Sequence, residues 1–179
     1  MASKLRVDSI LPVDGAPTNG GGGIIQCVST TKTDLFSLAT ETPTLITGLT
    51  ATITPKFNTS KVLISIDLIA SAGATNYTTW FYLYKGGSVI TGAQGANSGG
   101  IQGNQQRAFK ACRNYSSNDV MNVCGMYLDS PSTTSATTYQ VYMSQESGQT
   151  AYINKFANES NVSYAPRLVS SITLMEFSA

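Results

Sequence analysis

The sequence predicts an all-β protein: an antiparallel β-sandwich of jelly-roll type, preceded by an extended N-terminal arm. Three observations predict it. Apolar residues alternate with polar ones at a period of two, turn residues recur about every 8 to 12 positions, and no segment has the period of a long helix. The 179 residues are enough for one domain with its own core.

The alternation is clearest in LTATITPKFNTSKVLISIDL, residues 49–68. Every second residue from Leu49 to Ile53 is apolar, and threonines stand between them. The same rule holds from Val62 to Leu68, after a turn at residues 55–60. Successive side chains of a strand point to opposite faces, so each of these strands has one face for a core and one for contact with water.

Strand signals recur along the chain from Ile24 onward. The predicted strands are residues 24–30, 34–40, 44–54, 61–70, 77–85, 88–92, 106–114, 119–128, 137–144, 149–155 and 167–177. Gly86 and Gly87 predict a two-residue hairpin turn, because glycine tolerates positive φ at both central positions. The glycine-rich residues 92–103 and the polar residues 129–138 are predicted surface loops.

The three cysteines suggest a further hairpin. A turn near Asn118 would place Cys112 and Cys124 at equal distances from it, opposite each other on adjacent strands. The odd cysteine count and the absence of a signal-peptide pattern predict free thiols, including Cys27, in a protein that folds in a cytoplasm.

Residues 1–23 differ from the rest and are predicted to be a separate arm, with residues 24–179 as the sandwich. The arm ends in four consecutive glycines, a flexible tether. A disordered tail is the alternative interpretation. The arm is favoured because a solvated tail rarely needs aliphatic residues such as those expected to anchor it. These anchors are Leu5, Val7, Ile10 and Leu11.

The polar residues are mostly uncharged. Charged residues make up 12% of the chain, about half the usual share, while serine and threonine total 43. Hydroxyl-covered strands are easier to desolvate than charged ones, which predicts extensive contact between subunits. The alternative is that β proteins simply use threonine often. The net charge of +1 predicts that the protein does not bind nucleic acid. The lack of a long apolar run predicts that it does not insert into a membrane.

The residues that usually carry catalysis are missing or scattered. The chain has no histidine, which excludes Ser-His-Asp and Cys-His catalysis and histidine-ligated metals. The three cysteines form no CxxC pair, and the ten acidic residues lie in no recognisable catalytic pattern. We therefore expect no catalytic residues, no cofactor, no metal site and no enzymatic activity.

Aromatic residues cluster in NYTTWFYLY, residues 76–84. Alternation places Trp80, Tyr82 and Tyr84 on one face of the strand, and Phe81 and Leu83 on the other. One set is expected to be core. Trp80, Tyr82 and Tyr84 are the candidates for a subunit interface or for stacking on a receptor sugar.

Three stretches together carry a family resemblance. SKLRVDSILPVDG near the start, GLTATITPKFNTSKVLISIDL and the terminal SSITLMEFSA resemble small structural proteins of tailed bacteriophages, especially marine and cyanobacterial ones. The hairpin FYLYKGGSVI is also similar to that group. The resemblance covers most of the chain from Gly48 onward, together with the arm.

The resemblance implies a homotrimeric sandwich head like that of tumour-necrosis-factor-like trimers. The arm would dock the head onto other virion proteins, in the capsid or the tail, as a short tail fibre or a capsid decoration or cement protein. Such a virion protein is assembled in the host cytoplasm. A module of a tail fibre that binds a host surface glycan or another receptor is the alternative function.

Overall fold

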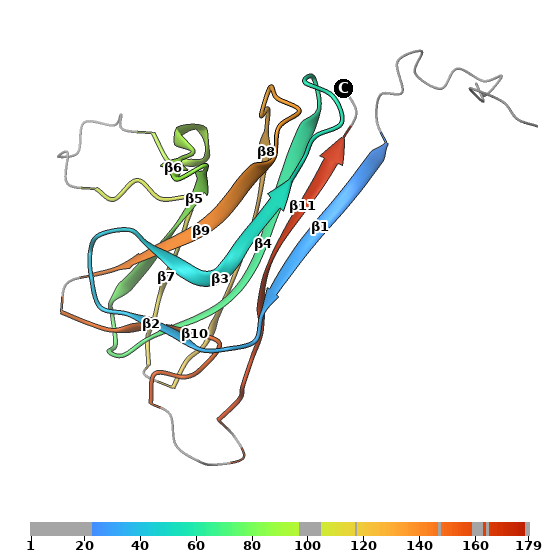
Figure 1. Cartoon of the computed structure of the whole chain (residues 1–179). Helices are drawn as coiled ribbons and strands as arrows, with labels where there is room; N and C mark the ends of the chain where they lie inside the picture. The colour runs from blue at the N-terminus through green and yellow to red at the C-terminus, as the bar shows by residue number, and fades with distance from the viewer. Residues whose placement is uncertain are drawn as a thin grey trace, which may run out of the picture.

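The computed structural model describes residues 23–96, 105–116, 118–146, 148–158, 163 and 165–177. Two antiparallel β-sheets pack face to face into a sandwich (Figure 1). The described residues contain eleven strands and one short 3-10 turn, Thr91–Ala93. The predicted all-β antiparallel sandwich is confirmed.

The larger sheet has six strands in the order β1-β11-β4-β10-β2, with β8 paired to β4 on the side opposite β11. Its strands are β1 (Ile24–Lys32), β2 (Phe36–Leu38), β4 (Lys61–Ala72), β8 (Met121–Asp129), β10 (Ala151–Ile153) and β11 (Ser170–Phe177). The start of β1 and the end of β11 lie side by side, because Ile24 pairs with Phe177 (Figure 1).

The smaller sheet has five strands in the order β3-β9-β5-β6, with β7 also paired to β5. Its strands are β3 (Thr44–Ile53), β5 (Thr78–Lys85), β6 (Ser88–Val89), β7 (Lys110–Arg113) and β9 (Thr137–Gln145). Each of the eleven predicted segments overlaps one of the observed strands. The greatest shortening is in residues 106–114, where β7 covers only Lys110–Arg113, and in residues 88–92 β6 ends at Val89 and the 3-10 turn follows.

The core lies between the sheets and is built by the predicted alternation. Leu49, Ala51 and Ile53 of β3 face inward, as does every second residue from Val62 to Leu68 of β4. On β5, Phe81 and Leu83 are the core residues, so the alternation predicted for this strand is confirmed. Removing large side chains from such a core costs about 2–5 kcal/mol each, so this packing holds both outer faces in place.

The β5–β6 hairpin has the predicted two-residue turn. Gly86 has φ 56° and Gly87 has φ 81°, the left-handed values that residues with a Cβ rarely adopt. Tyr84 then pairs with Val89 and Lys85 with Ser88. The turn therefore fixes where Lys85 and the 3-10 segment lie at this end of the molecule.

The predicted hairpin around Asn118 is wrong. β7 pairs with β5 in the smaller sheet, whereas β8 pairs with β4 in the larger one, so the chain crosses between sheets here. Cys112 is consequently buried opposite Thr79, and Cys124 is exposed opposite Asp67. Both thiols are free, and so is that of Cys27.

A buried carboxylate holds the turn between β3 and β4. Glu176 of β11 accepts hydrogen bonds from the Gln26 side chain and from the backbone N–H of Lys56, the latter at 2.6 Å. Burial alone raises the pKa of Glu176, but the neighbouring Ser60 hydroxyl and hydrogen bonds from Gln26 and the N–H groups of Lys56 and Phe57 outweigh it and hold the pKa below its usual range.

The predicted arm anchors Leu5, Val7, Ile10 and Leu11 lie outside the described residues, which begin at Gly23. No helix in the described part of the chain is long and apolar enough to cross a membrane.

Candidate association faces and a polar cavity

Five apolar side chains gather on the outer side of the larger sheet, at the end where β1 begins. They are Leu63, Met126, Leu128, Met175 and Phe177. We call this group the aliphatic face after its leucines and methionines, and Phe177 is its one aromatic member. Leu63 of β4 pairs with Leu128 on one side and Met175 on the other. Met126 is 68% exposed and Leu128 53% exposed, which is unusual for such residues when they lie together on a regular sheet.

The aliphatic face includes a shallow groove of about 370 Å³. Its walls are Leu63, Leu128, Phe177 and the stem of Lys61. The ammonium of Lys61 donates to the Ser130 hydroxyl at 2.8 Å, so this side chain presents its methylenes to the groove. The groove is therefore suited to apolar side chains of a partner.

Further along the same sheet the outward residues include a row of hydroxyls. Ser29, Thr173 and Ser65 pair in one row across β1, β11 and β4, and the hydroxyls of Ser29 and Thr173 lie 2.8 Å apart. Among the described outward residues of β1, β4, β8 and β11, only Lys61 and Asp67 carry a charge. This surface therefore has a low desolvation cost.

The outer side of the smaller sheet carries the predicted aromatic residues. Trp80, Tyr82 and Tyr84 do share this side, together with Tyr142 of β9, and we call the four the aromatic face. Tyr84 stacks on Tyr142 with ring centroids 3.7 Å apart. Tyr82 is only 3% exposed, and its hydroxyl lies 2.9 Å from that of Ser144.

The aromatic face is thus largely covered by its own members. Burial raises the pKa of Tyr82 despite its bond to Ser144, and burial together with the neighbouring tyrosines raises that of Tyr84. Trp80 and Tyr84 are half-buried, so of the three predicted contact residues these two offer surface to a partner.

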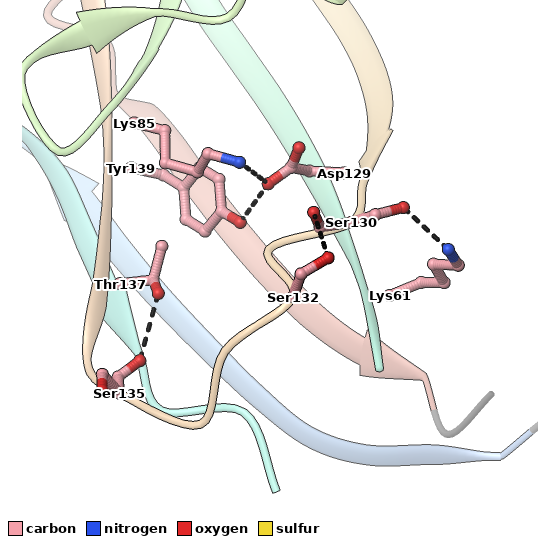
Figure 2. A network of polar contacts seen from close by, with 8 residues as sticks. All are labelled: Lys61, Lys85, Asp129, Ser130, Ser132, Ser135, Thr137 and Tyr139. Atoms are coloured by element: carbon pink, nitrogen blue, oxygen red, sulfur yellow. Dashed lines mark hydrogen bonds and ion pairs between the residues drawn. The ribbon is translucent and has the colours of Figure 1, made fainter. Parts of the chain in front are cut away.

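A polar network lies between the sheets at one end of the sandwich (Figure 2). Asp129, at the end of β8, accepts hydrogen bonds from the Tyr139 hydroxyl at 2.6 Å and from the Lys85 ammonium at 2.9 Å. Both end on the same oxygen, Oδ2. Burial, followed by the contact with Asp129, raises the pKa of Tyr139 far above its usual value, so this phenol remains a hydrogen-bond donor.

Beside this network is a cavity of about 310 Å³, open to solvent, which we call the polar cavity. Its polar or aromatic lining residues are Lys85, Ser88, Thr91, Tyr127 and Asp129. Gly92 also lines it, and its backbone lies so close to Tyr127 that a Cβ there would stand 2.5 Å from the phenol oxygen.

Sequence reasoning identified neither the aliphatic face nor the polar cavity. Asp129 was predicted to begin a loop, but it is the last residue of β8. The alternation of Met126 and Leu128 with small or polar neighbours is visible in the sequence, but it does not reveal which set points outward.

Among the described residues no three His, Cys, Asp or Glu side chains come together as a candidate metal site.

The sequence matches no family model and no curated protein. Among solved structures, the chain is similar to one of T=1 particles derived from infectious bursal virus, with 12% sequence identity and a TM-score of 0.44. The alignment covers 96% of this chain and 41% of the other, so this chain spans about two fifths of that neighbour's length. A similarity this distant assigns no function.

The protein therefore belongs, by its fold, to the class of antiparallel β-sandwiches. Its candidate functional features are the aliphatic face, the aromatic face and the polar cavity.

Proposed function

We propose that this protein is a bacteriophage virion structural protein, a homotrimeric sandwich that self-associates through its aliphatic face. The observation that carries the proposal is the exposure of Met126 and Leu128 beside an apolar groove on a regular sheet. In this proposal residues 1–23 dock the trimer onto the capsid or the tail, as a short fibre or a capsid decoration or cement protein.

Burial of the aliphatic face would stabilise an assembly substantially. Complete burial of a leucine, methionine or phenylalanine side chain contributes about 1.5–3 kcal/mol. Five such residues lie together, and Ile24, which is also exposed, pairs with Phe177 at the edge of the group. Partial burial of this group supplies the apolar centre that a stable interface needs.

The hydroxyl rows beside the aliphatic face favour an interface that tolerates salt. Surface ion pairs are screened over about 8 Å at physiological ionic strength and over shorter distances at higher salt. Contacts between Ser29, Ser65, Thr173 and their counterparts would not weaken in that way. A particle released into salt water would benefit from such contacts.

The virion assignment and the number of subunits rest on the resemblance of the sequence to small structural proteins of tailed phages. The segments that carry it include two of the three strands that line the groove, since Leu63 is in the central stretch and Phe177 is in the terminal one, whereas Leu128 lies in neither. The proposed interface is thus built partly from those segments and partly from β8.

We propose no enzymatic activity. The buried carboxylates are engaged in holding the fold: Glu176 binds the β3–β4 turn, and Asp129 binds Tyr139 and Lys85. Glu146 accepts a backbone hydrogen bond from Thr78 at 2.9 Å. The alternative function, binding of a host glycan or receptor, is favoured by the partly exposed Trp80 and by the polar cavity.

Purified particles of the phage that encodes the chain test the virion assignment. Mass spectrometry of washed particles should detect the protein at a stoichiometry comparable to known structural components. Its absence from particles, together with its presence in the infected-cell lysate, would refute the assignment.

Light scattering of the full-length chain tests self-association separately. We expect a mass three times 18.9 kDa, unchanged between low and high salt. A monomer at every salt concentration would contradict the proposed interface without bearing on the presence of the protein in particles.

A further inference from the structure

The polar cavity has the composition of a binding site rather than of a packing defect. It opens between the β8 edge of the larger sheet and the β5–β6 hairpin of the smaller one. Its volume of about 310 Å³ is at the lower end of the range for small-molecule sites, roughly 300–1,000 Å³. A few convergent polar groups beside an aromatic wall are what such sites commonly present.

We propose that the polar cavity binds one unit of a neutral saccharide. In this proposal the Asp129 carboxylate accepts hydrogen bonds from sugar hydroxyls, and Lys85, Ser88 and Thr91 supply further polar contacts. The ring of Tyr127 forms the apolar wall. The site is separate from the aliphatic face and from the proposed trimer.

The Asp129 carboxylate is oriented so that it can accept hydrogen bonds from a ligand. Tyr139 and Lys85 both donate to Oδ2, which fixes the side chain and leaves Oδ1 directed away from those two bonds (Figure 2). The Tyr139 donor is fully buried, so a firm part of the core fixes the orientation. A carboxylate oxygen has two acceptor positions, which suits a pair of neighbouring hydroxyls.

The charge balance of the cavity favours a neutral ligand. The ion pair of Lys85 and Asp129 has no net charge, so neither an anion nor a cation gains a large electrostatic advantage. The ammonium uses one N–H on Asp129 and has further donors for a sugar oxygen. The hydroxyls of Ser88 and Thr91 can both donate and accept, as sugar hydroxyls do.

Gly92 controls the shape of the cavity. Its missing side chain lets the backbone approach the Tyr127 hydroxyl, and a Cβ there would lie within 2.5 Å of it. An alanine would push the phenol away and change the wall without altering any charge. Gly92 is not in the left-handed region, so alanine introduces no backbone strain at this position.

Chemical-shift mapping of the full-length chain tests the proposal. Methyl glycosides of glucose, galactose, mannose and N-acetylglucosamine are titrated into ¹⁵N-labelled protein to high millimolar concentration. We expect at least one to shift the amides of residues 88–92 and 127–129, with millimolar affinity. A polysaccharide bearing the same unit, added in parallel, distinguishes recognition of a glycan from recognition of a free sugar.

Variants decide whether the polar cavity is responsible. Gly92→Ala and Asp129→Asn should each weaken binding at least tenfold, while Ser135→Ala, in the nearby loop but outside the lining, should leave it unchanged. If Asp129→Asn does not fold, the binding measured for Gly92→Ala alone shows whether the polar cavity is responsible.

Three outcomes would overturn the proposal: no glycoside shifts these amides, sulfate shifts them more strongly than any sugar, or Gly92→Ala leaves binding unchanged. The native mass of Gly92→Ala should equal that of the wild type, which separates failure of this site from failure of the trimer.

Discussion

The two outer faces of the sandwich are built by the same period-two rule and end in different states. On the smaller sheet the large side chains cover one another: Tyr84 stacks on Tyr142, and Tyr82 is buried and bonded to Ser144. On the larger sheet Met126 and Leu128 remain exposed beside an apolar groove. The large side chains of the first face are mostly buried against one another within one chain, whereas those of the second face remain partly exposed.

This difference shows that residue type alone does not tell which face remains exposed in the monomer. The aromatic face is the more conspicuous in the sequence, because tryptophan and tyrosine are enriched at interfaces. Its area is nevertheless mostly used within the monomer. The methionines and leucines of the aliphatic face are less conspicuous in the sequence, yet two of them, Met126 and Leu128, remain largely exposed.

The largest expected effect follows from placing charge on the aliphatic face. The double variant Met126→Lys/Leu128→Lys should weaken self-association at least a thousandfold, or about 4 kcal/mol, because two ammonium groups would have to be desolvated in an apolar groove. Sedimentation at increasing protein concentration measures this shift.

A matched control is Val169→Lys, which places a lysine at another exposed apolar position, 56% exposed and just before β11. Its association should match the wild type. Equal weakening by both variants would indicate a general charge effect rather than a specific face.

The next effect compares two neighbouring residues of β5 that point to opposite sides. Phe81→Ala should destabilise the fold by about 3–5 kcal/mol, because Phe81 is fully buried in the core. Trp80→Ala should cost less than half as much and leave the native mass unchanged. Urea unfolding in the Met126→Lys/Leu128→Lys background measures the two unfolding costs. Light scattering of Trp80→Ala in the otherwise wild-type chain measures the native mass. Dissociation by Trp80→Ala would move the interface to the aromatic face.

A smaller effect concerns Glu176, which anchors the strand that carries Met175 and Phe177. Because its folded-state pKa is below the unbonded value of 4.5, the carboxylate stabilises the fold above pH 4.5, and this contribution is lost as the pH falls through the folded-state pKa. Glu176→Gln should cost about 1.5–3 kcal/mol at neutral pH and flatten the acid side of the stability profile. Thermal unfolding between pH 7 and pH 3 measures it; an unchanged profile would contradict this role.

The smallest effect tests how much the hydroxyl groups of the aromatic face contribute to the stability of the monomer. Tyr82→Phe removes the bond to Ser144 and should cost about 1 kcal/mol. Tyr84→Phe should cost almost nothing, because the described residues give its hydroxyl no hydrogen bond while its ring stacking is retained. A reversed order of the two costs in urea unfolding would contradict this assignment.

Most of the fold could be predicted from the sequence because alternation is a local signal. Leu49, Ile53 and the apolar positions of β4 showed their inward direction through their neighbours alone, and the Gly86–Gly87 turn followed from backbone sterics. The partner of each strand is not a local property. The chain between Cys112 and Cys124 looks like a hairpin, yet it passes from one sheet to the other.

The candidate sites could be predicted only in part, for the same reason. Alternation placed Trp80, Tyr82 and Tyr84 on one face, but their mutual burial depends on Tyr142, far away in the sequence. The aliphatic face requires β4, β8 and β11 to be neighbours. The polar cavity likewise needs Lys85 and Asp129 to meet across two sheets.

The most direct measurement is the reactivity of Cys27 toward a thiol reagent in the full-length chain. Cys27 pairs with Met175 and is exposed in the monomer, whereas Cys112 is buried and its pKa is raised by burial to about 11, so it serves as an unreactive reference. We predict that Cys27 is protected in the wild type and reacts freely in Met126→Lys/Leu128→Lys. Equal, rapid labelling of Cys27 in both proteins would show that this face is not where the subunits meet.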